Sequence, residues 1–214
     1  MHHKKTVAVI GGTGKSGKYL LKKIVTRDLR IKALVRNPAT VGPQSTNLEI
    51  ITGDVKDYPT VESLIQGCDA VISTLGLGLP PDEPTLFSKA TRHVLRAMIK
   101  NRVRRYIVTA GLNVDTPYDE KSQKIKLATA WMYEHFPIST KDRQLEYDLL
   151  TESDVDWTLV RLPLIEQTDI FHEIIVNQKD CPSEKISAAS LAEFLILQIE
   201  DTSFIEKAPF VGNK

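Results

Sequence analysis

The chain has 214 residues, which is long enough to bury the core of one α/β domain without disulfides or metals. Its net charge of +1, from 28 basic and 27 acidic side chains, gives no concentrated basic surface of the kind that nucleic-acid-binding proteins carry. The two cysteines make neither a disulfide framework nor a metal-binding pattern. We therefore expect no metal site and no nucleic-acid partner, and a small molecule as the substrate.

The apolar segments also exclude a membrane protein. No stretch of about 18 consecutive apolar residues is present, as a transmembrane helix would need. The first five residues lead directly into a predicted strand and leave no room for the apolar region of a signal peptide. We expect a cytoplasmic protein without a membrane partner. Its oligomeric state, monomer or dimer, is left open.

In the first part of the chain, short apolar runs alternate with segments of helical length. The run at 6–10 is continuous, largely β-branched and followed by glycines, which is typical of a parallel strand covered on both faces. The same criteria predict further strands at 31–35, 48–51 and 70–73, and helices at 15–26 and 61–66.

A proline-rich turn at 80–84 begins the second part. It precedes a long predicted helix with Thr85 as its cap, on which Phe87, Val94 and Met98 recur at helical spacing and indicate a core face. Beyond this helix, the pattern predicts strands at 106–109 and 157–160 and helices at about 121–135 and at 142–150.

This alternation predicts one domain over residues 1–214, of α/β class, with a Rossmann-type doubly wound parallel sheet and helices on both faces. Residues 111–139 and 163–187 are less regular, and both follow the carboxyl end of a predicted strand. Open α/β sheets bind their ligands at that edge. We therefore expect these two segments to cover the substrate side.

A glycine-rich loop lies between the first predicted strand and the first predicted helix. In a dinucleotide-binding loop, the first glycine permits the tight turn, the second lets the backbone approach the pyrophosphate, and the third allows the helix to pack on the strand. The phosphates then meet unpaired N–H groups at the positive end of the helix. A purely structural turn is the alternative. The candidate residues are Gly11, Gly12, Thr13, Gly14, Lys15, Ser16 and Gly17.

Lys15 and Ser16 also resemble the end of a nucleoside-triphosphate loop. That motif requires another glycine, separated by four residues from the Gly-Lys pair, and Val9 occupies its place. The spacing therefore excludes this reading. Lys15 is expected to reach a phosphate of the dinucleotide, or solvent.

The end of the second predicted strand bears on which dinucleotide is bound. Proteins that prefer NAD usually have an acid there to bind the ribose hydroxyls, whereas this strand ends in Val35, Arg36 and Asn37. An arginine can pair with a 2′-phosphate through two hydrogen bonds. We therefore expect NADP(H) as the cofactor, with a simple surface role for Arg36 as the alternative.

Taken together, these motifs resemble the atypical short-chain dehydrogenase/reductase group, which includes biliverdin reductase B (the flavin reductase) and the NmrA-like proteins. The resemblance runs from residue 6 to about residue 165, with the order and spacing of the motifs preserved. The matching segments are residues 9–14, 33–36, 53–55, 69–72, 75–76, 97–98 and 156–163.

The resemblance implies roles for residues outside the glycine loop. Asp54 and Val55 would lie at the adenine, with a turn-forming role as the alternative for Asp54. Leu75 and Gly76 would pass beneath the cofactor, unless they simply end a strand. The nicotinamide end would be approached by Thr109 and Pro163.

The chain departs from this group at its chemistry. Short-chain dehydrogenases use a Tyr-x-x-x-Lys pair to protonate the substrate oxygen. After the fifth predicted strand, Tyr118, Tyr133 and Tyr147 all lack a lysine four residues later. Tyr19 and Lys23 have the right spacing but lie on the first predicted helix, away from the site.

The flavin-reductase pattern also fails in part, because its serine corresponds to Gly111 and its histidine to Tyr147. Tyr147 is our candidate proton donor, with Lys141 or Arg143 placed to lower its pKa. The alternative is that Tyr147 packs its ring in an amphipathic helix and exposes its hydroxyl.

Two functions agree with a complete cofactor pattern beside an incomplete catalytic one. The first is an NADP(H)-dependent oxidoreductase that passes a hydride to a flavin, a quinone or a similar conjugated acceptor, for which solvent can supply the proton. The second is a non-catalytic NADP(H) sensor of NmrA-like type. An epimerase or dehydratase is disfavoured, because such enzymes keep the tyrosine and lysine and add a larger substrate domain.

Overall fold

The computed structural model describes residues 4–41, 45–76 and 84–214. An eight-stranded sheet forms the centre, with the strand order β3-β2-β1-β4-β5-β6-β10-β8. All neighbouring strands are parallel except β8 and β10, which pair in antiparallel fashion. These strands are β1 (Thr6–Ile10), β2 (Arg30–Val35), β3 (Leu48–Thr52), β4 (Ala70–Ser73), β5 (Arg105–Gly111), β6 (Asp156–Leu162), β8 (Ile174–Asn177) and β10 (Phe210–Asn213).

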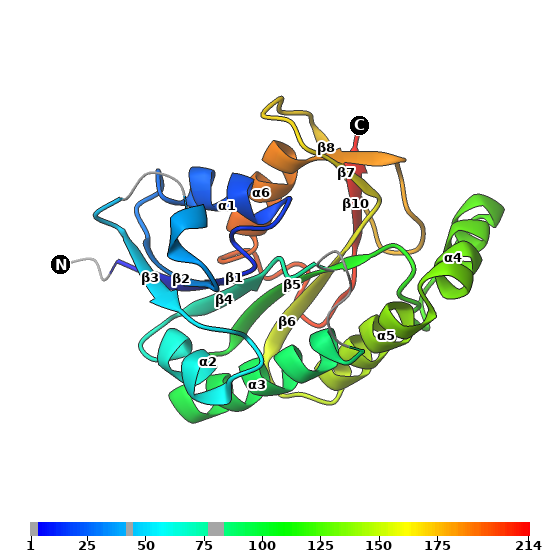
Figure 1. Cartoon of the computed structure of the whole chain (residues 1–214). Helices are drawn as coiled ribbons and strands as arrows, with labels where there is room; N and C mark the ends of the chain where they lie inside the picture. Colours follow the sequence, from blue (N-terminus) through cyan, green and yellow to red (C-terminus); the bar gives the residue numbers. More distant parts are fainter. Residues whose placement is uncertain (1–3, 42–44, 77–83) are drawn as a thin grey trace.

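Helices cover both faces of this sheet (Figure 1). α1 (Gly17–Ile24) and α6 (Ala188–Leu197) lie on one face, whereas α2 (Tyr58–Ile65), α3 (Leu86–Asn101) and α5 (Pro137–Thr151) lie on the other. α4 (Gln123–His135) packs against α5 and projects from the body of the molecule. The predicted doubly wound Rossmann-type fold is confirmed.

Each face of the sheet has its own hydrophobic core, because alternate side chains of a strand point to opposite faces. On β1, Val7 and Val9 pack toward α1 and α6, while Ala8 and Ile10 pack toward α2 and α3. Both cores are aliphatic near β1. This strand is therefore buried along its whole length, as its uninterrupted apolar sequence predicts.

The carboxyl-terminal third contains elements that the sequence patterns did not predict. β7 (Leu164–Glu166) and β9 (Lys185–Ser187) form a separate two-stranded parallel sheet. β8 and β10 extend the main sheet beyond β6, and α6 covers the face that α1 leaves open. The segment 163–187 is thus partly strand. Among the described residues, no helix has the length and apolar character to cross a membrane.

Arg161 on β6 is fully buried and organises the segments around the edge of the sheet. Its guanidinium donates hydrogen bonds to the carbonyl oxygens of Ala208 (2.8 Å), Val114 (3.0 Å) and Gln178 (3.3 Å). It also forms an ion pair with Asp119, at 2.7 Å. One charged side chain therefore connects the loop after β5, the loop after β8 and the segment before β10.

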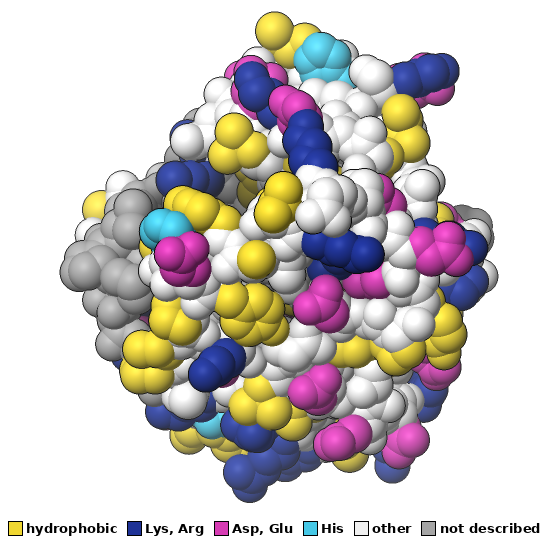
Figure 2. Space-filling model, turned by 90° about the vertical axis from the view of Figure 1, so that its right-hand side faces the viewer, with side chains coloured by type: hydrophobic (Ala, Val, Ile, Leu, Met, Phe, Trp, Pro, Cys, Tyr) yellow, Lys and Arg dark blue, Asp and Glu magenta, His cyan; other side chains and the backbone are white. Residues whose placement is uncertain are grey.

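Figure 2 shows the face on the side of α4 and the sheet edge. Hydrophobic side chains are exposed there in small groups separated by Lys, Arg, Asp and Glu. Charges of both signs are interspersed over this face, in keeping with the net charge of +1.

Candidate functional site

An elongated pocket of about 450 Å³ opens where the parallel strands β1 to β4 end. This is the edge at which open α/β sheets bind ligands, and the strand order reverses here between β1 and β4. The lining residues are Ile10, Gly11, Thr13, Gly14, Lys15, Ser16, Leu34, Val35, Arg36, Gly53, Asp54, Val55, Lys56, Thr74, Leu75, Gly76, Leu86 and Ile165.

The glycines of the loop after β1 are required by its close packing. Gly11 has a φ of +77°, and a Cβ atom there would lie 2.7 Å from the backbone of Thr74. A Cβ atom on Gly17 would lie 2.0 Å from the carbonyl oxygen of Gly11. At Gly14 the nearest atom would be that same oxygen at 3.2 Å, a tight contact that a shift of a few tenths of an ångström would relieve, and the residue borders the pocket. The loop therefore presents bare backbone to a ligand.

Helix α1 starts at the end of this loop with its positive end directed at the pocket. Ser16, at its N-cap, makes no side-chain capping hydrogen bond, and the first turn contains no acidic residue. Unpaired N–H groups at a helix N-terminus bind phosphate groups. The residues present therefore fit the pyrophosphate of a dinucleotide.

The end of the pocket beside β2 and β3 is the basic end. Arg36 and Lys56 line it together with Asp54, and Lys15 lies toward the glycine loop. The Asp54 carboxylate accepts a hydrogen bond from the backbone N–H of Lys56 (2.9 Å), which fixes the turn after β3. Asp54 is thus both a turn-forming residue and a lining residue. Lys56 was missed in the sequence, although its place two residues after Asp54 could have suggested it.

The other end of the pocket is apolar. Leu75 and Gly76 follow β4, Leu86 begins α3, and Ile165 lies on β7. These residues belong to segments widely separated in the chain, which explains why only Leu75 and Gly76 could be identified from the sequence. In a dinucleotide-binding sheet, this is the side on which the nicotinamide lies.

A buried polar cluster on α5 contacts the backbone of the apolar end of the pocket, at Leu75. Arg143 donates hydrogen bonds to the carbonyl oxygen of Leu75 and to the carboxylate of Glu146. Its guanidinium also lies over the ring of Phe87, 3.3 Å from the ring centre. Glu146 accepts a hydrogen bond from the Thr91 hydroxyl on α3 (2.9 Å). Helix α5 therefore fixes the backbone that follows β4.

The start of α3 is capped by this same helix and not by its own N-cap residue. Thr85 stands at the predicted N-cap position, but its side chain makes no capping hydrogen bond. The Asp142 carboxylate accepts hydrogen bonds from the backbone N–H groups of Phe87 (2.7 Å) and Ser88 (3.3 Å) instead. The tertiary contact supplies what the local sequence does not. Of the predicted proline-rich turn at 80–84, only Pro84 lies within the described residues.

The remaining cofactor candidates do not line the pocket. Gly12 faces the Leu21 side chain, and Gly17 packs on the loop backbone. Thr109 is buried on β5, where its hydroxyl donates a hydrogen bond to the carbonyl oxygen of Ser73 (3.4 Å). Pro163 is buried immediately after β6.

The two catalytic candidates are not brought to this pocket. Tyr147 packs in the core between α5 and the sheet, with its ring 6.0 Å from that of Trp157. It lines a second cavity that shares no lining residue with the cofactor pocket. Lys141 is exposed and lines neither. No group of three metal-ligating side chains occurs among the described residues.

A glycine loop at a strand-to-helix turn, with an exposed helix N-terminus and a basic pocket end, defines a dinucleotide-binding Rossmann protein. Residues 11–202 match the model of the NAD(P)H-binding family, and the chain belongs to that family. The match spans the glycine loop, the pocket and the second cavity's α5 wall. The resemblance to atypical short-chain dehydrogenases is thereby confirmed at the level of this family.

Several curated proteins are similar to the chain at low identity. YwnB of Bacillus subtilis is 25% identical over 72% of the chain and 70% of its own length. Cinnamoyl-CoA reductase 1 of Arabidopsis thaliana is 27% identical over 50% of the chain and 34% of its own length. The photosystem II assembly factor Ycf39 of Trieres chinensis is 25% identical over 92% of the chain and 61% of its own length. The chain thus spans about a third of the reductase it matches.

Solved structures share the fold. The oxidoreductase ylbE of Lactococcus lactis superposes with a TM-score of 0.79 at 19% identity, over 98% of this chain and 91% of its own. A short-chain dehydrogenase/reductase of Veillonella parvula, solved in complex with NADP, has a TM-score of 0.77 at 16% identity, over 99% and 95% of the two chains. At these identities, the likeness is one of fold.

Proposed function

We propose that the protein is an NADP(H)-dependent oxidoreductase that transfers a hydride between the nicotinamide and a flavin, a quinone or a similar conjugated small molecule. The observation that carries the cofactor preference is the basic end of the pocket, where Arg36 follows directly after β2 in place of an acid. A guanidinium there attracts a 2′-phosphate, whereas a ribose hydroxyl would be better served by a carboxylate.

The apolar end of the pocket supports the acceptor class. Leu75, Leu86 and Ile165 give this end apolar walls. Such surfaces bind the planar face of a conjugated ring system and keep water from the reacting atoms. When bound, the nicotinamide supplies the hydride itself. The chain needs only to hold the ring, fix the Leu75 backbone through Arg143, and admit the acceptor.

The proton that accompanies the hydride comes from solvent in this proposal. Among the described residues that line the apolar end, none has a titratable side chain. Flavins and quinones reduced at their conjugated system acquire protons readily from water, unlike a simple ketone, which needs a placed acid. The relative named a cinnamoyl-CoA reductase does not decide the substrate, because the chain covers a third of it.

The lack of a titratable side chain among the described residues of the apolar end also favours a second function, an NADP(H) sensor without turnover. A sensor needs a cofactor pocket and a way to distinguish the oxidised from the reduced cofactor, but no proton donor. The two functions differ in one measurable property, namely turnover.

The experiment is a titration followed by an activity assay. Calorimetry should show NADPH binding at least several-fold tighter than NADH, and equal affinities would contradict the assignment of Arg36. NADPH oxidation is then followed at 340 nm with FMN, menadione and a set of aldehydes. Turnover with FMN or menadione supports the reductase, whereas tight NADPH binding without turnover on any acceptor supports the sensor.

A further inference from the structure

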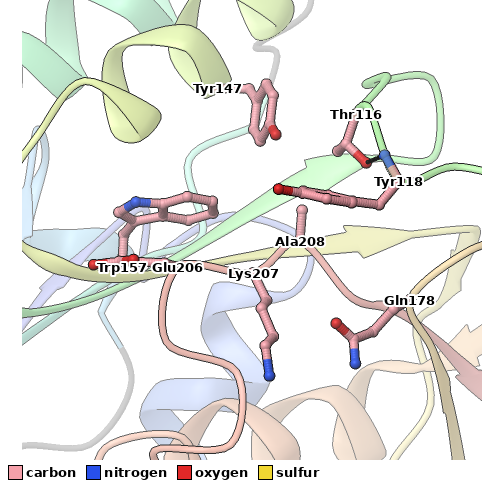
Figure 3. A pocket seen from close by; sticks show the side chains of 8 residues that line it. All are labelled: Thr116, Tyr118, Tyr147, Trp157, Gln178, Glu206, Lys207 and Ala208. Atoms are coloured by element: carbon pink, nitrogen blue, oxygen red, sulfur yellow. Dashed lines mark hydrogen bonds between the residues drawn. The ribbon is translucent and has the colours of Figure 1, made fainter.

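A second cavity, of about 240 Å³, lies on the α5 face of the sheet, away from the cofactor pocket. Its lining comes from the loop after β5, from α5, from the start of β6 and from the segment before β10 (Figure 3). Trp157 is the second residue of β6, whereas the cofactor side of that strand is at Leu162. At about 3.3 Å per residue along β6, Trp157 and Leu162 are roughly 17 Å apart. The lining residues are Thr116, Tyr118, Tyr147, Trp157, Gln178, Glu206, Lys207 and Ala208.

Three aromatic rings border this cavity, the buried Tyr147 and Trp157 and the exposed Tyr118. Tyr147 and Trp157 meet edge to face, with their ring planes at 87°. Tyr118 comes from the opposite side on a loop, and it is 76% exposed although its ring borders the cavity. Figure 3 shows the hydroxyl ends of Tyr118 and Tyr147 directed toward the space between the rings. A large exposed aromatic side chain over an aromatic hollow is a surface that a planar ligand would cover.

The Tyr147 hydroxyl is the polar group that points to a ligand. The residue is only 8% exposed, yet its hydroxyl makes no hydrogen bond with any described residue. The hydroxyl oxygen is not one of the fully enclosed, unpartnered polar atoms of the described residues, so it opens into the cavity, where a ligand or water can take its hydrogen bond. Burial also raises the pKa of this hydroxyl, so it keeps its proton at neutral pH and can donate.

The other polar groups of the lining are largely engaged within the protein. The Thr116 hydroxyl donates to Asp119 (2.8 Å), and the Lys207 ammonium donates to the carbonyl oxygen of Ser203 (2.9 Å). Figure 3 places the ends of Lys207 and Gln178 away from the rings, beyond Ala208. The cavity therefore offers the tyrosine hydroxyls at one end and the Trp157 ring as its apolar wall, while Glu206 and Lys207 stand at its solvent-facing rim.

The loop that carries Tyr118 is held firmly, so the cavity exists before any ligand arrives. Arg161 and Lys121 are both buried, and each forms an ion pair with an aspartate of this loop. Arg161 pairs with Asp119 at 2.7 Å, and Lys121 with Asp115 at 2.6 Å. Glu206, on the opposite rim, has a φ of +55°, which is unusual for a residue with a side chain. A preformed cavity costs a ligand little reorganisation.

We propose that this cavity is a second small-molecule site, which takes a planar ligand of one or two fused rings with a carbonyl or phenolate oxygen that accepts a hydrogen bond from Tyr147. The volume sets the size, since it lies below the roughly 300–1,000 Å³ of sites for drug-sized ligands. The site is independent of the proposed oxidoreductase activity. Its occupant binds together with the dinucleotide and does not compete with it.

The probe for this proposal is 7-hydroxycoumarin, a planar bicyclic phenol with a carbonyl group. The chain contains two tryptophans, and Trp131 is exposed on α4. The W131F variant therefore leaves Trp157 as the only tryptophan. Excitation of Trp157 should produce saturable coumarin emission by energy transfer, because the probe would lie against its ring. Saturating NADP⁺, which is not fluorescent, should leave the titration unchanged.

Two variants in the W131F background locate the probe. Tyr147→Phe should weaken binding by about 3- to 10-fold, as expected for one lost hydrogen bond. Tyr118→Ala, at an exposed position that the fold does not need, should weaken it further. Tyr133→Phe removes the hydroxyl of a half-buried tyrosine on α4 outside the cavity and should change nothing.

The proposal is overturned by any of three results. These are the absence of saturable energy transfer up to millimolar probe, loss of the signal when NADP⁺ is added, and unchanged affinity in both Tyr118→Ala and Tyr147→Phe with the fold intact by circular dichroism.

Discussion

Arg36 is the residue on which the proposed cofactor preference depends, because it lines the pocket directly after β2, where a 2′-phosphate would lie. Arg36→Ala should remove most of the difference between NADPH and NADH, which amounts to about 1–3 kcal/mol for a charge-assisted hydrogen bond. NADH affinity should change little. Arg30→Ala is the matched control, since Arg30 is exposed at the opposite end of the same strand. Calorimetric titration of both cofactors tests this, and an unchanged ratio in Arg36→Ala would refute it.

Gly14 and Gly17 should respond differently to substitution, although both belong to the same loop. Gly14→Val places its branched side chain in the pocket, where the pyrophosphate must touch the backbone, so NADPH binding should be lost while the fold remains. Gly17→Ala forces a Cβ atom against the carbonyl oxygen of Gly11, so it should also lower the melting temperature. Circular dichroism and calorimetry separate the two effects. A folded Gly14→Val variant that still binds NADPH would remove this loop from the site.

The start of helix α3 depends on helix α5, because Asp142 on α5 caps the N-terminus of α3. Asp142→Ala leaves two N–H groups at the start of α3 without a partner and should lower the free energy of unfolding by about 1–3 kcal/mol. For a domain of this size, that corresponds to a melting temperature lower by about 2–4 °C per kcal/mol. Asp148→Ala, at an exposed position of α5, is the control and should change the melting temperature by less than a degree. Equal effects of the two substitutions would show that the cap contributes no stability.

The elements predicted from the sequence are those whose pattern is local. β1 and β4 are continuous apolar runs, and α3 shows a clear helical period, so all three were found within a few residues. β8 and β10 have four residues each and are strands only because of their pairing: β10 pairs with β6 on one side and with β8 on the other. The site divides in the same way. The glycine loop and Arg36 are local motifs, whereas Ile165 reaches the pocket on β7, a three-residue strand that exists only through its pairing with β9.

At the scale of the whole molecule, stability depends on the buried Arg161 more than on its surface charges. Arg161→Leu removes the 2.7 Å partner of the nearly buried Asp119 and leaves it Lys121, at 3.7 Å, as its cation; removing one member of a buried pair costs up to about 3–5 kcal/mol. Arg104→Leu breaks an exposed pair with Asp156 and should cost about 0–1 kcal/mol. Urea unfolding of both variants measures the difference. If the two variants lose similar amounts of unfolding free energy, Arg161 contributes no more to stability than an exposed arginine does.

The position of β10 in the sheet has a consequence for how the protein is made. This strand lies between β6 and β8, and the segment just before it accepts a hydrogen bond from Arg161. A growing chain can therefore assemble β1 to β6 and their helices, but it must wait for residues 207–213 before Arg161 is enclosed and β8 has a neighbour. Until then, the edge of β6 is open to strands of other nascent chains. A chain that ends before residue 207 would lack β10 and would present the backbone edge of β6 to other chains.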